Sequence, residues 1–140
     1  MPADFTVIMK VRHHFGDNED SLLGAFVGRD RDFPFDCPDI DAGQDAVLMF
    51  QSLNIDHDKN NFEVNHETIS GGLPISRSSD DWTGNVMLIR PNVLRATGNV
   101  LHIGARDDRG SILGNVDDFV IDNMVVMYKT RERLGPILSG

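Results

Sequence analysis

The sequence has few of the residues that indicate a disulfide-bonded, membrane-spanning or nucleic-acid-binding protein. It contains 1 cysteine in 140 residues, so no disulfide can form within the chain. Lysine and arginine together number 13 against 22 aspartates and glutamates, which gives a net charge of −9. Non-specific binding of DNA or RNA needs clustered cations, so this balance argues against it. No apolar run approaches the roughly 20 residues of a membrane-spanning helix.

Signals for export and for catalysis are also lacking. Residues 1–11 have no basic segment followed by an apolar one, so we expect no signal peptide, and localisation stays open between the cytoplasm and export by another route. Cys37 has neither zinc-site spacing nor an activating base, which predicts an inert thiol. The five histidines show no metal-binding spacing. We therefore predict a protein that is not an enzyme, although its many carboxylates leave a glycosidase-like pair open.

What the sequence does contain is a series of short apolar runs separated by turn residues. Hydrophobic residues make up 40% of the chain, and 13 glycines and 6 prolines supply frequent turns. The runs lie at residues 5–11, 22–27, 46–53, 62–65, 69–75, 85–89, 100–104 and 119–128. About eight short strands separated by turn signals are typical of an antiparallel β-sandwich. We expect an all-β, single-domain fold over residues 1–130, followed by a C-terminal tail at 131–140.

The segments differ in the roles that they suggest. Residues 46–53 are apolar at nearly every position, which predicts a central strand. Residues 13–20 are predicted to be a polar loop. Residues 29–44, rich in Asp and Pro, are predicted to be a long connection of the kind that often carries function. The only helix expected is one turn at residues 91–94, where Pro91 could begin it.

Three segments share their order along the chain with one known kind of domain. They are Asn61-Phe62-Glu63-Val64-Asn65 followed by Ile69; Gly98-Asn99 followed by Leu101 and Ile103, after Trp82, Leu88 and Leu94; and Asp117-Asp118-Phe119 followed by Ile121-Asp122-Asn123. This order resembles that of galactose-binding-like, carbohydrate-binding-module-like β-sandwiches, and it covers residues 46–129. The resemblance implies a jelly roll. It departs at His66, where such domains commonly have a turn glycine.

A first candidate site lies around Trp82, the only tryptophan. An aromatic ring can stack on the C–H face of a sugar while polar neighbours bind its hydroxyls. We predict a carbohydrate site formed by Trp82 with Asp81, Asn85 and Arg90. The alternative is that Trp82 belongs to the core or the edge of a sheet.

A second candidate site is acidic. Asp118 and Asp122 are separated by an even number of residues within a predicted strand, so their side chains share a face. An Asp inside the apolar run, as Asp122 is, should face solvent, cap a loop backbone or coordinate a cation. Carbohydrate-binding jelly rolls often hold structural Ca²⁺ near this strand, and Asp17, Glu19 or Asp20 could supply further ligands here.

A third acidic motif comprises Asp56, Asp58, Asn60 and Glu67, which match four positions of a helix-loop-helix calcium loop. Asn61 stands where that loop needs glycine, and strands rather than helices are predicted on both sides. A polar hairpin turn is the default interpretation.

Two hypotheses for function follow from these observations. The first is a non-catalytic, lectin-like carbohydrate-binding module stabilised by Ca²⁺. The second is a structural or assembly subunit that uses the sandwich as a building block of a homo- or hetero-oligomer. The fold hosts both kinds of protein, so the resemblance alone does not decide between a carbohydrate and a protein partner.

Overall fold

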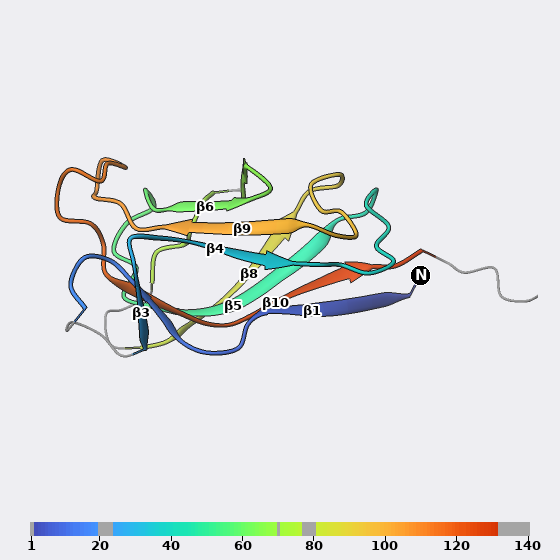
Figure 1. Ribbon diagram of the computed structural model, residues 1–140, viewed down its shortest axis with the longest axis horizontal. Helices are drawn as coiled ribbons and strands as arrows, with labels where there is room; N and C mark the ends of the chain where they lie inside the picture. Colours follow the sequence, from blue (N-terminus) through green and yellow to red (C-terminus); the bar gives the residue numbers. More distant parts are fainter. Residues whose placement is uncertain (1, 20–23, 70, 77–80, 132–140) are drawn as a thin grey trace, which may run out of the picture.

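The computed structural model describes residues 2–19, 24–69, 71–76 and 81–131, and these residues form two β-sheets packed face to face (Figure 1). The strands are β1 (Ala3–Met9), β2 (His13–Phe15), β3 (Ala25–Gly28), β4 (Asp30–Phe35), β5 (Ala46–Leu53), β6 (Asn61–Val64), β7 (Glu67–Thr68), β8 (Thr83–Ile89), β9 (Asn99–Gly104) and β10 (Phe119–Lys129). The described part of the chain contains no helix, and therefore none that could span a membrane. The predicted all-β sandwich is confirmed, with ten strands rather than about eight.

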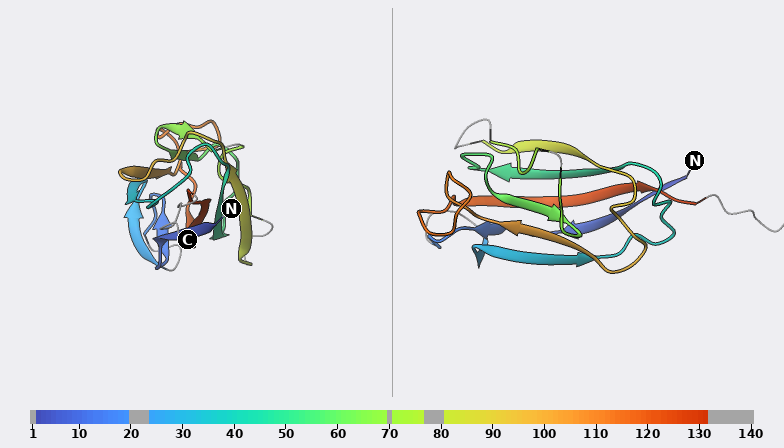
Figure 2. Two further views of the ribbon diagram at one scale, coloured as in Figure 1. Left: turned by 90° about the vertical axis from the view of Figure 1, so that its right-hand side faces the viewer. Right: turned by 90° about the horizontal axis from the view of Figure 1, so that it is seen from above.

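The two sheets differ in size and in the way they are built. The larger has six strands in the order β3-β2-β10-β5-β8, with β1 also paired to β10, and the smaller has four in the order β4-β9-β6-β7. Figure 2 shows both layers from the end and from above. All strand pairs among the described residues are antiparallel except β2 with β3. Strand β5 lies between β10 and β8, so the prediction of a central strand at residues 46–53 is confirmed.

The core between the sheets is built from alternate residues of the strands. Phe15 of β2 stacks on Phe119 of β10 with ring centroids 5.3 Å apart, and Phe50 of β5 meets the edge of Phe62 of β6 at 5.4 Å. Full burial of a phenylalanine side chain contributes about 1.5–3 kcal/mol to the free energy of folding. The contact between Phe50 and Phe62 joins the larger sheet to the smaller one, because β5 belongs to the larger sheet and β6 to the smaller.

Strand β10 changes part-way along which of its side chains face the core. Asn123 has a φ of 50°, and the pairing with β5 shifts register between Asp122 and Val125, which marks a β-bulge. The side chains of β10 in the core cluster are odd-numbered before the bulge and even-numbered after it: Phe119, Ile121, Met124, Val126 and Tyr128. Val120 and Asp122 are also buried but lie outside that cluster. The bulge therefore turns Val125 and Met127 to the outer face of the larger sheet.

Two segments that were predicted as loops contain strands. His13–Phe15 forms β2 and is buried against β10, and the first part of the 29–44 segment forms β4. The polar ring of His13 is accommodated because its Nδ1 lies 2.8 Å from the carbonyl oxygen of Val11. Pro34 is tolerated because β4 is an edge strand, where a missing N–H need not break a ladder.

Three other predictions need correction or fall outside the structure. Residues 69 and 71–76 form no strand, although Ile69 and Leu73 are buried. Residues 91–94 form a turn rather than a helical turn, because Asn92 adopts a left-handed conformation with φ of 68°. Of the run at 22–27, residues 22 and 23 lie outside the described residues, and strand β3 begins at Ala25.

The bulge predicts a specific pattern of stability at position 123. Asn123→Val should lower the free energy of unfolding by about 1–3 kcal/mol, because a β-branched residue is strained at positive φ. Asn123→Gly is the matched control and should stay close to wild type, because glycine adopts this conformation freely. Urea denaturation measures both. Equal losses in the two variants would show that the conformation of residue 123 is unimportant.

Candidate functional site

The structure separates the four residues of the predicted carbohydrate site. Trp82 and Arg90 flank the two ends of β8, with all seven residues of the strand between them. Asn85 faces the interior, where its buried Nδ2 donates a hydrogen bond of 2.9 Å to Ser52 Oγ. Trp82 therefore has Asp81 beside it in the chain, but neither Asn85 nor Arg90.

A residue that the sequence did not single out lies against Trp82. The guanidinium of Arg12 is 5.1 Å from the centroid of the Trp82 ring, within the range of a cation–π contact. Arg12 Nε also donates a hydrogen bond of 3.2 Å to Asp122 Oδ2. Trp82 is 36% exposed and forms part of a Trp82–Arg12–Asp122 chain on the outer side of the larger sheet.

The predicted metal ligands Asp118 and Asp122 accept hydrogen bonds from the protein itself. Asp118 Oδ1 lies 3.1 Å from both His14 Nε2 and the backbone N of Asn18. Asp122 bonds Arg12 through Oδ2 and the backbone N of Asn123 through Oδ1. The described residues hold no group of three or more His, Cys, Asp or Glu side chains arranged around a metal. A calcium ion at these residues stays a prediction.

Asp118 therefore caps the backbone of the loop at Asn18. The capped loop needs glycine at position 16, because Gly16 has a φ of 141° and a Cβ there would collide with the Asp118 carboxylate. Asp17 and Glu19, the other predicted ligands, are exposed on this loop, and Asp20 lies outside the described residues. The arrangement is a hydrogen-bonded turn rather than a preformed cation site.

An open pocket of about 860 Å³ lies between the loops at one end of the sandwich, among residues 54–57 and 107–118. Its wall includes the buried Asp117, which is 6% exposed. Asp117 Oδ2 accepts hydrogen bonds from the backbone N of Asp56 at 3.0 Å and from Asn60 Nδ2 at 2.9 Å, whereas Oδ1 has no hydrogen-bond partner among the described residues. Burial is the main cause that raises the pKa of Asp117. Burial of this kind favours the neutral form of the carboxyl group.

The other carboxylates of this pocket mostly organise its own loops. Asp107 accepts hydrogen bonds from the backbone N of Ser111, Arg109 and Gly114, and the Ser111 bond is the main cause that lowers its pKa. Asp118 is engaged as described above. The pocket wall thus holds one buried carboxyl, that of Asp117, together with the exposed Asp56 and Asp108.

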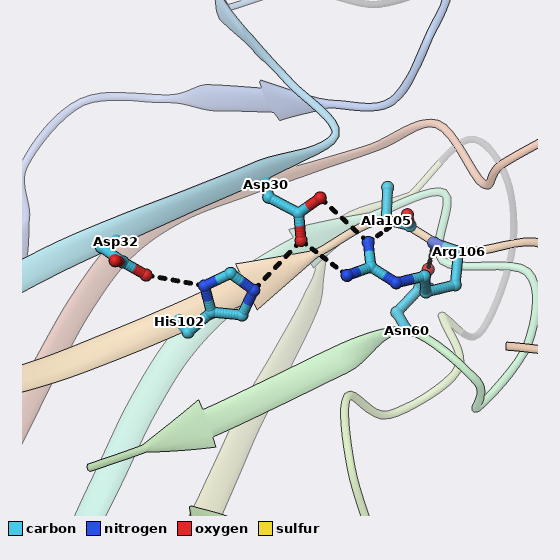
Figure 3. A network of polar contacts seen from close by, with 6 residues as sticks. All are labelled: Asp30, Asp32, Asn60, His102, Ala105 and Arg106. Atoms are coloured by element: carbon cyan, nitrogen blue, oxygen red, sulfur yellow. Dashed lines mark hydrogen bonds and ion pairs between the residues drawn. The ribbon is translucent and has the colours of Figure 1, made fainter. Parts of the chain in front are cut away.

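The outer face of the smaller sheet carries a polar network (Figure 3). His102 lies between two carboxylates, with Nδ1 2.6 Å from Asp32 Oδ1 and Nε2 3.0 Å from Asp30 Oδ1. Arg106 Nη2 donates to the same Asp30 oxygen at 2.8 Å. Burial by itself raises the pKa of Asp30, but the bonds and charges of Arg106 and His102 outweigh it, and the pKa is lowered. The network ties edge strand β4 to β9.

The outer face of the larger sheet has the opposite character. Eight apolar side chains point outward in two rows that cross β1, β10, β5 and β8: Phe5, Met127, Val47 and Leu88 in one row, and Val7, Val125, Met49 and Val86 in the other. We call these eight residues the apolar face. Val86 is 72% exposed and Phe5 61%, and no residue of the set is fully buried. Contiguous apolar surface of this extent usually marks an interaction site.

Comparison of the chain with models of protein families, with curated proteins and with solved structures found no match. The two-sheet sandwich is shown by the structure, and its relation to galactose-binding-like domains rests on the sequence resemblance alone.

Asp30 and Asp117 should change the pH dependence of stability in opposite directions. The lowered pKa of Asp30 gives stability that is present above its unfolded pKa of about 3.9 and is lost as the pH falls. The raised pKa of Asp117 means that stability is lost as the pH rises from that value through its folded pKa.

We therefore expect Asp30→Asn to lose less stability than wild type on acidification below about pH 4. Asp117→Asn should lose less than wild type as the pH rises above that point. Urea denaturation of both variants from about pH 3 to about pH 8 checks this, each variant serving as the control for the other. Profiles parallel to wild type would contradict the assigned shifts.

Proposed function

We propose that this protein is a structural assembly subunit that associates with a second copy of itself through the apolar face. The observation that carries the proposal is the unbroken grid of eight apolar side chains on four hydrogen-bonded strands. The outer face of the smaller sheet is polar by comparison, because it carries Asp30, Asp32, Glu63 and His102. The outer face of the smaller sheet is thus suited to contact with water, and that of the larger sheet to an interface from which water is excluded.

The energetics favour a protein partner over solvent. Full burial of a valine-sized to phenylalanine-sized side chain contributes roughly 1.5–3 kcal/mol. Association costs about 4–15 kcal/mol in lost translational and rotational freedom. The free energy gained by burying eight partly exposed apolar side chains from each copy is of similar size. The net charge of −9 opposes attachment of this face to an anionic membrane surface.

Leu88 provides a direct test. Leu88→Lys should leave the monomer folded, because the side chain is 59% exposed, and should weaken self-association roughly a hundredfold or more by placing a charge in an apolar contact. Analytical ultracentrifugation over a concentration series measures the dissociation constant. The matched control is Val100→Lys on the outer face of the smaller sheet, which should associate as wild type does. A wild-type protein that stays monomeric throughout would refute the proposal.

Carbohydrate binding is the second candidate function, favoured by the partial exposure of Trp82 next to Asp81. The jelly-roll resemblance supports it, because sugar-binding modules share that fold. Here Arg12, rather than Asn85 or Arg90, would be the polar neighbour of the aromatic ring.

Fluorescence of the single tryptophan, titrated with a panel of polysaccharides, tests this candidate. Binding should shift the emission saturably with one glycan, because only Trp82 contributes to the signal. A shift that disappears in EDTA would connect the site to the predicted calcium ion. Emission unmoved by every glycan would remove Trp82 as a sugar platform.

A further inference from the structure

The pocket between the loops at one end of the sandwich has an unsatisfied buried oxygen in its wall. We call this pocket of about 860 Å³, among residues 54–57 and 107–118, the loop pocket. Asp117 lies in its wall and is 6% exposed. Asp117 Oδ2 accepts two hydrogen bonds, whereas no described group bonds to Oδ1. Most buried polar atoms have a partner, so an orphaned oxygen beside a pocket points to an occupant of that pocket.

A second carboxyl group lies near the first. Asp56 donates its backbone N–H to Asp117 Oδ2 at 3.0 Å, and its own side chain is exposed in the pocket wall. Burial is the largest cause that raises the pKa of Asp117, and the negative charge of Asp56 raises it further. The two carboxylates therefore repel one another. A positive charge close to both would remove that repulsion.

The charges of the whole wall also favour a cation. The described lining residues include one arginine, Arg109, and five aspartates: Asp56, Asp107, Asp108, Asp117 and Asp118. Asp56 comes from the loop between β5 and β6, and Asp108 from the loop between β9 and β10, and both are exposed. A cleft lined mainly by one sign of charge concentrates ions of the opposite sign.

Hydrogen bonds between these two loops hold the pocket in shape. Asn54 Nδ2 donates to the carbonyl oxygen of Asp118 at 2.9 Å, and the backbone N of Arg106 donates to Asn60 Oδ1 at 2.8 Å. Asn60 also bonds Asp117, so the orphaned carboxyl group is fixed by the same contacts. A ligand therefore enters a largely preformed site, where little free energy is lost in ordering the loops.

The chemistry of the wall narrows the class of ligand. An ammonium group brings three N–H donors of its own, whereas a metal ion needs several ligands already gathered around it. The described residues hold no such group of three or more His, Cys, Asp or Glu side chains. Leu113 and Val116 add apolar surface to the wall, against which methylene groups can pack. A water molecule would bond to Oδ1 but would leave Asp56 and Asp117 repelling one another.

We propose that the loop pocket binds an aliphatic diamine, with one ammonium group held between Asp117 Oδ1 and the Asp56 carboxylate. The second ammonium group faces the exposed Asp108, and the methylene chain packs on Leu113. Hydrogen bonds between an ammonium group and a carboxylate are charge-assisted and stronger than neutral ones, which makes Asp117 the principal contact. The site shares no residue with the apolar face, so the proposal does not rest on self-association.

Isothermal titration calorimetry with putrescine tests the site. Wild type should bind putrescine with a dissociation constant below about 1 mM. The diol analogue, in which hydroxyl groups replace both ammonium groups, should bind at least about tenfold more weakly because it carries no charge.

Asp117→Asn should raise the dissociation constant for putrescine about tenfold or more. Asparagine keeps the shape of the side chain, and its oxygen can still accept the bonds from Asp56 and Asn60, so its amide nitrogen takes the place of the Oδ1 acceptor. The matched control is Asp45→Asn, which removes the same charge from an exposed side chain at the other end of β5. It should change the dissociation constant less than about twofold, because distant exposed charges are screened.

Amide chemical shifts provide a second measurement. Putrescine should shift the backbone amide signal of Asp56 and the side-chain amide signal of Asn60, since both groups donate to Asp117 Oδ2. The amide signals of Val86 and Leu88 on the apolar face should not move. If Asp117→Asn does not fold, Asp56→Asn serves as the test variant, because that side chain is exposed, and it should raise the dissociation constant about threefold or more.

Three results would overturn the proposal. Putrescine that binds no more tightly than its diol analogue would show that the pocket does not recognise ammonium groups. Equal weakening by Asp117→Asn and Asp45→Asn would show only a diffuse attraction of amines to an acidic protein. Shifts confined to residues outside the loop pocket would place the amine elsewhere. The dimer is measured without amine and with Leu88→Lys, so failure of either proposal leaves the other standing.

Discussion

The pairing of β10 with three other strands is the constraint on which the rest of the structure depends. Its eleven residues bind β2 and β1 along one edge and β5 along the other, so the larger sheet cannot form without it. The bulge at Asn123 divides the strand into two functional halves. Before the bulge, Asp122 binds Arg12, and Asp118, just ahead of the strand, bonds His14 and the backbone of Asn18. After the bulge, the outward side chains of Val125 and Met127 are apolar.

The two outer surfaces follow from this division and from the composition of the neighbouring strands. The smaller sheet uses its outer side for charge, with His102 and Arg106 gathered around Asp30. The larger sheet uses its outer side for apolar residues, although the chain as a whole is acidic. A sandwich needs only its inner faces to be apolar. The second apolar surface is therefore not required by the fold and points to a contact beyond it.

Much of the architecture could be predicted from the sequence, because strand patterns are local. The run at 46–53 was predicted to be central from its apolar residues at both parities, and it lies between β10 and β8. That pattern also contained the apolar face, since Val47 and Met49 lie on the face opposite to Leu48 and Phe50, and a single opposing sheet covers only one face of a strand. The sequence predicted the central position of the strand, and the structure adds that Val47 and Met49 on its outer side are only half-buried.

The candidate sites were harder to predict, because they depend on which strands pair. Trp82 and Asn85 are an odd number of residues apart, so strand alternation places them on opposite faces. The network of Asp30, His102 and Arg106 joins residues more than 70 positions apart, through a pairing that no local pattern reveals. The β-bulge could not be predicted either, because the polar pair Asp122-Asn123 within an apolar strand does not by itself indicate a change of register.

The position of β8 adds a consequence for the isolated chain. Among the described residues β8 pairs only with β5, so it forms an edge of the larger sheet. Its outer backbone groups are open to another strand, and Val86 and Leu88 beside them are exposed. An open edge next to apolar side chains is a template for edge-to-edge growth. Pairing of two copies through the apolar face would compete with that growth. The relative rates of the two contacts would then decide whether a closed dimer or a fibre forms.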